Sequence, residues 1–169
     1  MAGLADLGFE DESRTIKLPS GKSSFTVSGL SVEGIARLIR GRASEMEDVF
    51  AKFMQDRDQL GVVGDPKFAR SVGSRFGQTL LDKAPRLAAD IIAIASGEPD
   101  SWEIAQRLPF TVQIEALEAV VELTFNGEEG SKKAMEALSK MVRAATSIME
   151  DQNLSQIGSM DYSGMSPSS

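Results

Sequence analysis

Three groups of residues in this sequence are of types that could do chemistry, and the first is a short run near the N-terminus. Gly21-Lys22-Ser23 ends like a phosphate-binding loop, in which backbone N–H groups and a lysine surround the phosphates of a nucleotide. That loop also needs a glycine five residues before its last glycine, and this chain has Ile16 there. We therefore interpret the run as the turn of a hairpin and not as a nucleotide site.

The second group is a stripe of acidic residues in the second half of the chain. Glu115, Glu118 and Glu122 follow one another at intervals of three and four residues, which places them on one side of a helix. Such a stripe could hold a hard cation or face a basic partner, because carboxylate oxygens suit both tasks. The alternative is a solvated helix face. No histidine accompanies these residues, so a di-metal site between helices is not predicted.

The third group is a basic cluster made of Arg37, Arg40 and Arg42. It could contact nucleic acid, but the chain carries a net charge of −7, which disfavours binding to a phosphate backbone. The alternative is that these arginines balance nearby acidic residues or meet an acidic protein surface. No nucleic-acid partner is predicted.

The composition removes further classes of chemistry. The 169 residues include no cysteine and no histidine, which leaves no disulfide framework, no thiolate nucleophile and no imidazole for acid–base or metal chemistry. We expect a protein that is not an enzyme and that has no cofactor and no metal. The sequence shows no secretory signal and no apolar run of about 18 residues. We therefore expect a soluble, intracellular protein with no membrane partner.

The elements that must position these groups are mostly helical. A change to two-residue alternation predicts a β-hairpin with strands near residues 15–18 and 25–27. The fold class is therefore mainly α (α+β), a compact domain of about six helices with an N-terminal hairpin. A flexible acidic arm (1–13), a single helical domain (14–150) and a disordered tail rich in Ser, Gly and Met (151–169) make up the chain. Helical patterns cover residues 31–41, 42–55, 67–83, 85–95, 102–105, 110–125 and 131–150.

The most apolar part of the chain lies between Ala84 and Phe125. Residues 87–95 carry a single charge, Asp90, so this helix is predicted to be covered on most sides by other parts of the domain. Pro109 breaks the chain direction before the next helix begins. We interpret this stretch as scaffold, because it contains no reaction chemistry.

The last helix carries the candidate partner-binding surface. Methionine side chains are flexible and suit surfaces that accept varied apolar partners. The alternative is that the same side chains fill the core of the domain itself. The residues predicted to bind a partner are Met135, Leu138, Met141, Val142, Ile148 and Met149.

Two stretches give the sequence a family resemblance. The run FTVSGLSVEGIARLIRGRASEMEDVF and the block from Ala84 to Phe125 resemble the tail assembly chaperones of long-tailed bacteriophages, also called pre-tape-measure proteins. The shared features are a hairpin leading into a helix that starts at Gly29-Leu30-Ser31, and a later pattern A-P-x-L, A-x-G-E-P, L-P and Q-x-E-A-L. The resemblance extends over roughly residues 14–145 and rests on packing motifs.

The resemblance implies a non-enzymatic chaperone in the cytoplasm of the host cell. Such a protein binds the tape measure protein, a long helical chain, keeps it soluble during tail assembly and is absent from the mature virion. Tail-tube protein, a frameshifted longer form of the chain itself and a homo-oligomer are further candidate partners. One alternative is a structural virion protein of the tail or its junctions. A third interpretation is a small acidic enzyme or regulator, which would require a ligand pocket lined by converging carboxylates such as Glu115, Glu118 and Glu122.

Overall fold

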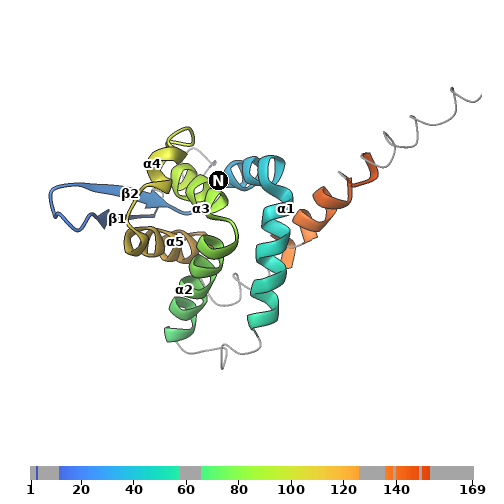
Figure 1. Ribbon diagram of the computed structural model, residues 1–169, viewed down its shortest axis with the longest axis horizontal. Coiled ribbons are helices and arrows are strands. Elements are labelled where there is room, and N and C mark those ends of the chain that lie inside the picture. The colour runs from blue at the N-terminus through green and yellow to red at the C-terminus, as the bar shows by residue number, and fades with distance from the viewer. Residues whose placement is uncertain are drawn as a thin grey trace, which may run out of the picture.

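The computed structural model describes Gly3 and residues 12–57, 66–125, 136–138, 140–148 and 150–152. Within these residues the protein is mainly helical, with six helices and an N-terminal two-stranded antiparallel hairpin, so the predicted fold class is confirmed (Figure 1). A last helical segment runs through the described residues from 136 to 152. The other elements are β1 (Ser13–Lys17), β2 (Ser24–Ser28), α1 (Val32–Arg57), α2 (Pro66–Lys83), α3 (Pro85–Ala95), α4 (Trp102–Gln106) and α5 (Phe110–Thr124).

The described helices and strands extend slightly beyond residues 14–150, the predicted bounds of the helical domain. Strand β1 already begins at Ser13, and Asp151 and Gln152 are still helical. The rest of the predicted tail, the start of the predicted last helix at residues 131–135 and most of the predicted arm lie outside the described residues.

The hairpin turn contains the Gly-Lys-Ser run. The N–H of Gly21 donates to the carbonyl of Leu18 at 2.8 Å, and the N–H of Leu18 donates to the carbonyl of Ser23 at 2.9 Å. Gly21 has a φ of 66°, a left-handed conformation that glycine adopts without steric cost. The interpretation of this run as a turn is confirmed. Ile16 and Val27 are fully buried and attach the hairpin to the helices.

Helix α1 begins with the predicted cap and bends where a helix end was predicted. The hydroxyl of Ser31 accepts the N–H of Gly34 at 3.1 Å. The sequence predicted two helices separated at Gly41, whereas the structure shows one helical path with a kink at Arg42, where φ is −142° and ψ is 29°. The position of the break was correct, although the second helix follows the first without a loop.

Two glycines of α2 face α5, and one of them is in tight contact. A Cβ atom placed on Gly77 would lie 3.3 Å from the Cβ of Leu117, whereas one on Gly73 would lie at an ordinary contact distance, 3.6 Å from the Cα of Glu118. Gly77 weakens an isolated helix, but here it leaves room for Leu117. The rings of Phe50 and Phe76, 5.6 Å apart, join α1 to α2 on the same side of the core.

Helix α3 is the centre of the domain, as its composition predicted. It contacts α1, α2, α4 and α5. Seven residues of α3 are buried: Leu87, Ala88, Ala89, Ile91, Ile92, Ala93 and Ala95.

The turn between α4 and α5 is fixed by Gln113, whose amide Nε2 donates to the carbonyls of Leu108 at 2.7 Å and Gln106 at 3.2 Å.

Candidate partner-binding surface

The predicted binding residues of the last helical segment divide into two groups. Leu138 and Val142 are 8% and 1% exposed and belong to the domain's own core. Met141 and Ile148 are 49% and 59% exposed. Leu138 and Val142 therefore fill the core, whereas Met141 and Ile148 lie on the surface, so the core-filling alternative for the methionines does not hold for Met141. The predicted residues Met135 and Met149 lie outside the described residues.

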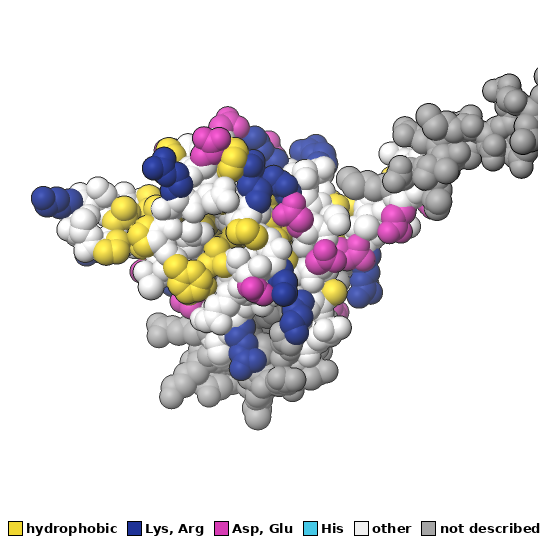
Figure 2. Space-filling view, in the orientation of Figure 1, with side chains coloured by type: hydrophobic (Ala, Val, Ile, Leu, Met, Phe, Trp, Pro, Cys, Tyr) yellow, Lys and Arg dark blue, Asp and Glu magenta, His cyan; other side chains and the backbone are white. Residues whose placement is uncertain are grey.

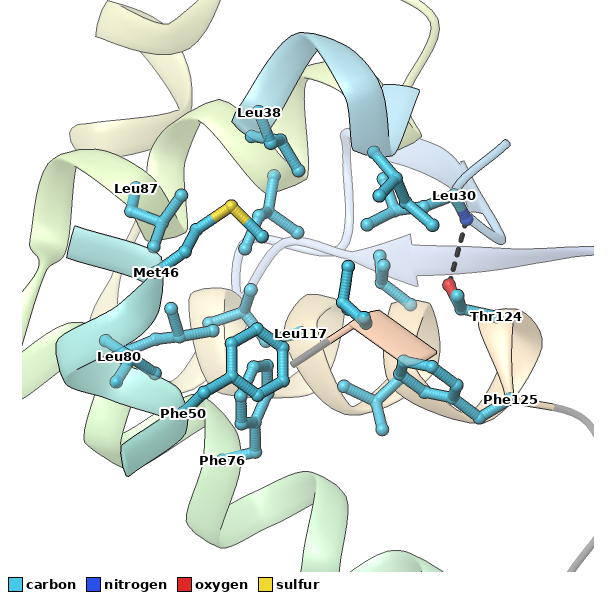
Figure 3. A pocket seen from close by; sticks show the side chains of 16 residues that line it. Leu30, Leu38, Met46, Phe50, Phe76, Leu80, Leu87, Leu117, Thr124 and Phe125 are labelled. Atoms are coloured by element: carbon cyan, nitrogen blue, oxygen red, sulfur yellow. Dashed lines mark hydrogen bonds between the residues drawn. The ribbon is translucent and has the colours of Figure 1, made fainter. Parts of the chain in front are cut away.

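Leu138, one of the two inner residues, lines an apolar cavity of about 40 Å³ together with side chains of α1, α2, α3 and α5. Figure 3 labels several of these side chains. Thr124 is the one polar side chain among the lining residues, and its hydroxyl accepts the N–H of Leu30 at 2.9 Å. The space is far smaller than the roughly 300 Å³ at which ligand pockets begin. The cavity is therefore a small packing gap that Leu138 helps to cover.

The outer group belongs to a regular exposed stripe. Ala137, Met141, Ala144 and Ile148 follow one another at intervals of four, three and four residues, and all four are exposed. This spacing keeps the side chains on one side of a helix. Figure 1 shows that the segment extends away from the rest of the protein, and Figure 2 shows acidic and basic side chains near its base. A partner helix could therefore reach the stripe without displacing the core.

Two arginines of the basic cluster form ion pairs with acidic residues of the same domain. Nε of Arg42 donates to the carboxylate of Asp90 at 3.1 Å, and its Nη1 donates to Glu45 at 2.8 Å. Partial burial alone would lower the pKa of Arg42, but these two carboxylates outweigh that effect and raise the pKa. Arg86 also pairs with Asp90, at 3.2 Å, and stacks on Trp102, with 3.0 Å between its guanidinium carbon and the ring centre.

Asp90 therefore connects the kink of α1 to α3. Arg37, the second member of the cluster, pairs with Asp100 at 3.3 Å, and Arg40 is exposed. The interpretation that these arginines balance nearby acids is confirmed for Arg37 and Arg42.

The acidic stripe of α5 is not gathered into a site. Glu122 pairs with Arg14 of β1 at 2.6 Å, which ties the hairpin to α5. Glu115 is exposed, and Glu118 lies beside the backbone of Gly73. No group of three or more acidic, histidine or cysteine residues that could hold a metal ion occurs within the described part of the chain.

Comparison with protein families matches residues 2–158 to the family described as "Pre-tape measure protein". The chain belongs to the pre-tape-measure family. The match includes the hairpin, α1 to α5 and the helical segment with the exposed stripe. No curated protein and no solved structure matches the chain significantly. Family membership confirms the resemblance and gives the protein a role in phage tail assembly.

The structure of this pre-tape-measure protein also exposes apolar side chains that the sequence did not single out. Val32, Ile104 and Phe110 are 81%, 67% and 63% exposed. Ile104 could not be placed from the sequence, because only the fold shows that its neighbour Ala105 faces the core, and successive helix residues point about 100° apart. None of the helices among the described residues is long and apolar enough to cross a membrane.

Proposed function

We propose that this protein is a non-enzymatic tail assembly chaperone that binds the tape measure protein and keeps it soluble in the host cytoplasm. The observation that carries the proposal is the exposed stripe with Met141 and Ile148 on a helix that extends from the domain. An amphipathic helix presents such a stripe to the apolar face of a partner helix. A long helical cargo offers many faces of this kind before it is assembled.

The strength of one contact follows from the exposed fractions. A large apolar side chain that becomes fully buried contributes about 1.5 to 3 kcal/mol, and Met141 and Ile148 have about half of that left to gain. Two such half contributions do not overcome the cost of association, which is at least about 4 kcal/mol. Several separate copies along one cargo chain would each pay this cost again, so we infer that further residues, such as the predicted Met135 and Met149, contribute to binding.

The net charge of the chain supports the proposal that the protein keeps its cargo soluble. A net charge of −7 gives every bound copy an acidic surface, and like charges keep complexes apart in solution. The fixed inner residues have a separate role. Leu138 and Val142 hold the helix on the domain so that its outer side stays exposed.

Co-expression with the tape measure protein of the same phage genome tests the proposal. We expect the cargo to move from the insoluble to the soluble fraction, and Met141→Glu to reduce that effect. The control is Ser147→Glu, which adds the same charge at an exposed position beside the stripe. A tape measure protein that stays equally insoluble with and without the chain would contradict the proposal, and equal effects of the two variants would place the binding surface elsewhere.

The alternative function is a structural protein of the tail or its junctions. Mass spectrometry of purified virions distinguishes the two, because a chaperone is absent from mature particles. The same co-expression strain shows whether tail-tube protein copurifies. Intact-mass measurement shows whether a longer, frameshifted form of the chain is made.

A further inference from the structure

We propose that a second copy of this chain packs antiparallel against the exposed stripe of the last helical segment. The stripe alternates in size, with Ala137 and Ala144 as small members and Met141 and Ile148 as large ones. Intervals of four and three residues are those of a helix that pairs along a coiled-coil seam. A seam of alternating size packs best when each large side chain meets a small one.

An antiparallel second copy satisfies this requirement along the whole stripe. Running the second helix in the opposite direction places Ala137 opposite Ile148 of the second copy and Met141 opposite Ala144 of the second copy. The two-fold axis repeats both contacts, because a symmetric pair uses the same patch twice. Every described position of the stripe then has a partner of complementary size.

A parallel pair lacks this complementarity. Each residue would meet its own counterpart, so the paired alanines at 137 and at 144 would leave gaps between the helices. The charges disfavour it as well. Asp151 continues the stripe three residues after Ile148, and in a parallel pair it would face the Asp151 of the second copy. Like charges directly opposite one another destabilise a pair, and the antiparallel arrangement separates the two Asp151 residues to opposite ends.

The pairing has a consequence for the chaperone, and this step rests on the proposed function. Met141 and Ile148 would be shielded in the free pair and exposed when the copies separate. A cargo helix would then compete with the second copy for the same side chains, so that the free chaperone does not present its stripe to unrelated proteins.

The absence of native cysteine allows a direct test of orientation in the full-length protein. Ala137→Cys and Ile148→Cys are made separately, mixed and oxidised. The antiparallel register brings these two positions together and predicts a mixed disulfide between the two variants. It keeps each cysteine about 16 Å from its own counterpart along the axis, for eleven residues at 1.5 Å each, well beyond the roughly 7 Å limit for a disulfide. Disulfides within each variant alone, or no disulfide at all, would overturn the proposal.

Sedimentation of the cysteine-free chain from micromolar to millimolar concentration gives the second measurement. We expect a reversible monomer–dimer equilibrium that Ala144→Glu abolishes, because a charged side chain would lie opposite Met141 of the second copy. Ser147→Glu lies beside the stripe, next to Lys140 of the second copy, and is expected to leave the dimer intact. Monomers at every concentration, or equal loss in both variants, would refute the pairing. Neither result depends on cargo, so the proposed function can fail or hold separately in the co-expression experiment.

Discussion

The junction between the hairpin and α5 allows a sharp prediction for Gly29→Ala. A Cβ atom on Gly29 would lie 2.7 Å from the carbonyl oxygen of Leu123 and 2.9 Å from its carbonyl carbon. Both are backbone atoms of α5 and cannot rotate away as the end of a side chain could. The next residue, Leu30, donates its N–H to Thr124, so a shift of the junction also strains that hydrogen bond.

The magnitude follows from two opposing effects. Overpacking in a close contact costs typically about 1 to 3 kcal/mol. Replacing glycine by alanine restricts the unfolded chain and returns about 0.4 to 1 kcal/mol. Taking the middle of each range, we expect Gly29→Ala to lower the free energy of unfolding by about 1 to 2 kcal/mol. For a domain of this size that corresponds to a fall in Tm of about 2 to 8 °C.

Urea unfolding monitored by circular dichroism measures the effect, with Gly73→Ala as the matched control. A Cβ on Gly73 meets Glu118 at ordinary contact distances of 3.6 to 3.9 Å. Since alanine also favours a helix interior by up to about 1 kcal/mol, this variant should be more stable than the natural protein. If Gly29→Ala unfolds at the natural urea midpoint, the hairpin does not lie against the α5 backbone as described.

The remaining predictions concern three other contacts, each measured by urea unfolding. Asp90→Asn removes the shared partner of two arginines and should cost about 1 to 2 kcal/mol, whereas Asp82→Asn, which alters a side chain that is 71% exposed, should change stability by less than about 0.5 kcal/mol. Gln113→Leu leaves two carbonyls at the α4–α5 turn without their donor and should cost about 1 to 3 kcal/mol; an unchanged midpoint would mean that water replaces the amide. Val142→Ala should cost about 1 to 3 kcal/mol and make residues 136–152 cleavable by limited proteolysis; unchanged protease resistance would contradict the role of Val142 in holding this helix.

Much of the fold could be predicted because its signals are local. The apolar residues 87–95 required cover on most sides, and α3 is the buried centre of the domain. Pro85 and Pro109 marked the starts of α3 and α5, since proline is accepted before or in the first turn but not inside a helix. The hairpin followed from two-residue alternation around the glycine turn.

The positions of charged and apolar side chains between elements could not be predicted in the same way. Arg42 and Asp90 are 48 residues apart, and no local pattern joins them. The last helix presented one broad apolar side in the sequence, and only the packed structure shows that Leu138 and Val142 face inward while Met141 and Ile148 face outward. That division depends on which side of the helix meets the domain, which is a property of the whole fold.

The two apolar sides of the last helix have opposite requirements. The inner side must be complementary to one fixed surface, and its branched residues Leu138 and Val142 have few rotamers and pack in a defined way. Under the proposed chaperone function the outer side must release its partner again, which favours small contacts and the adaptable side chain of Met141. Alanines between the large residues limit the area buried and hence the affinity of each contact. A chaperone that leaves its cargo after assembly needs this weak outer side, whereas a permanent virion protein would gain from larger residues at Ala137 and Ala144.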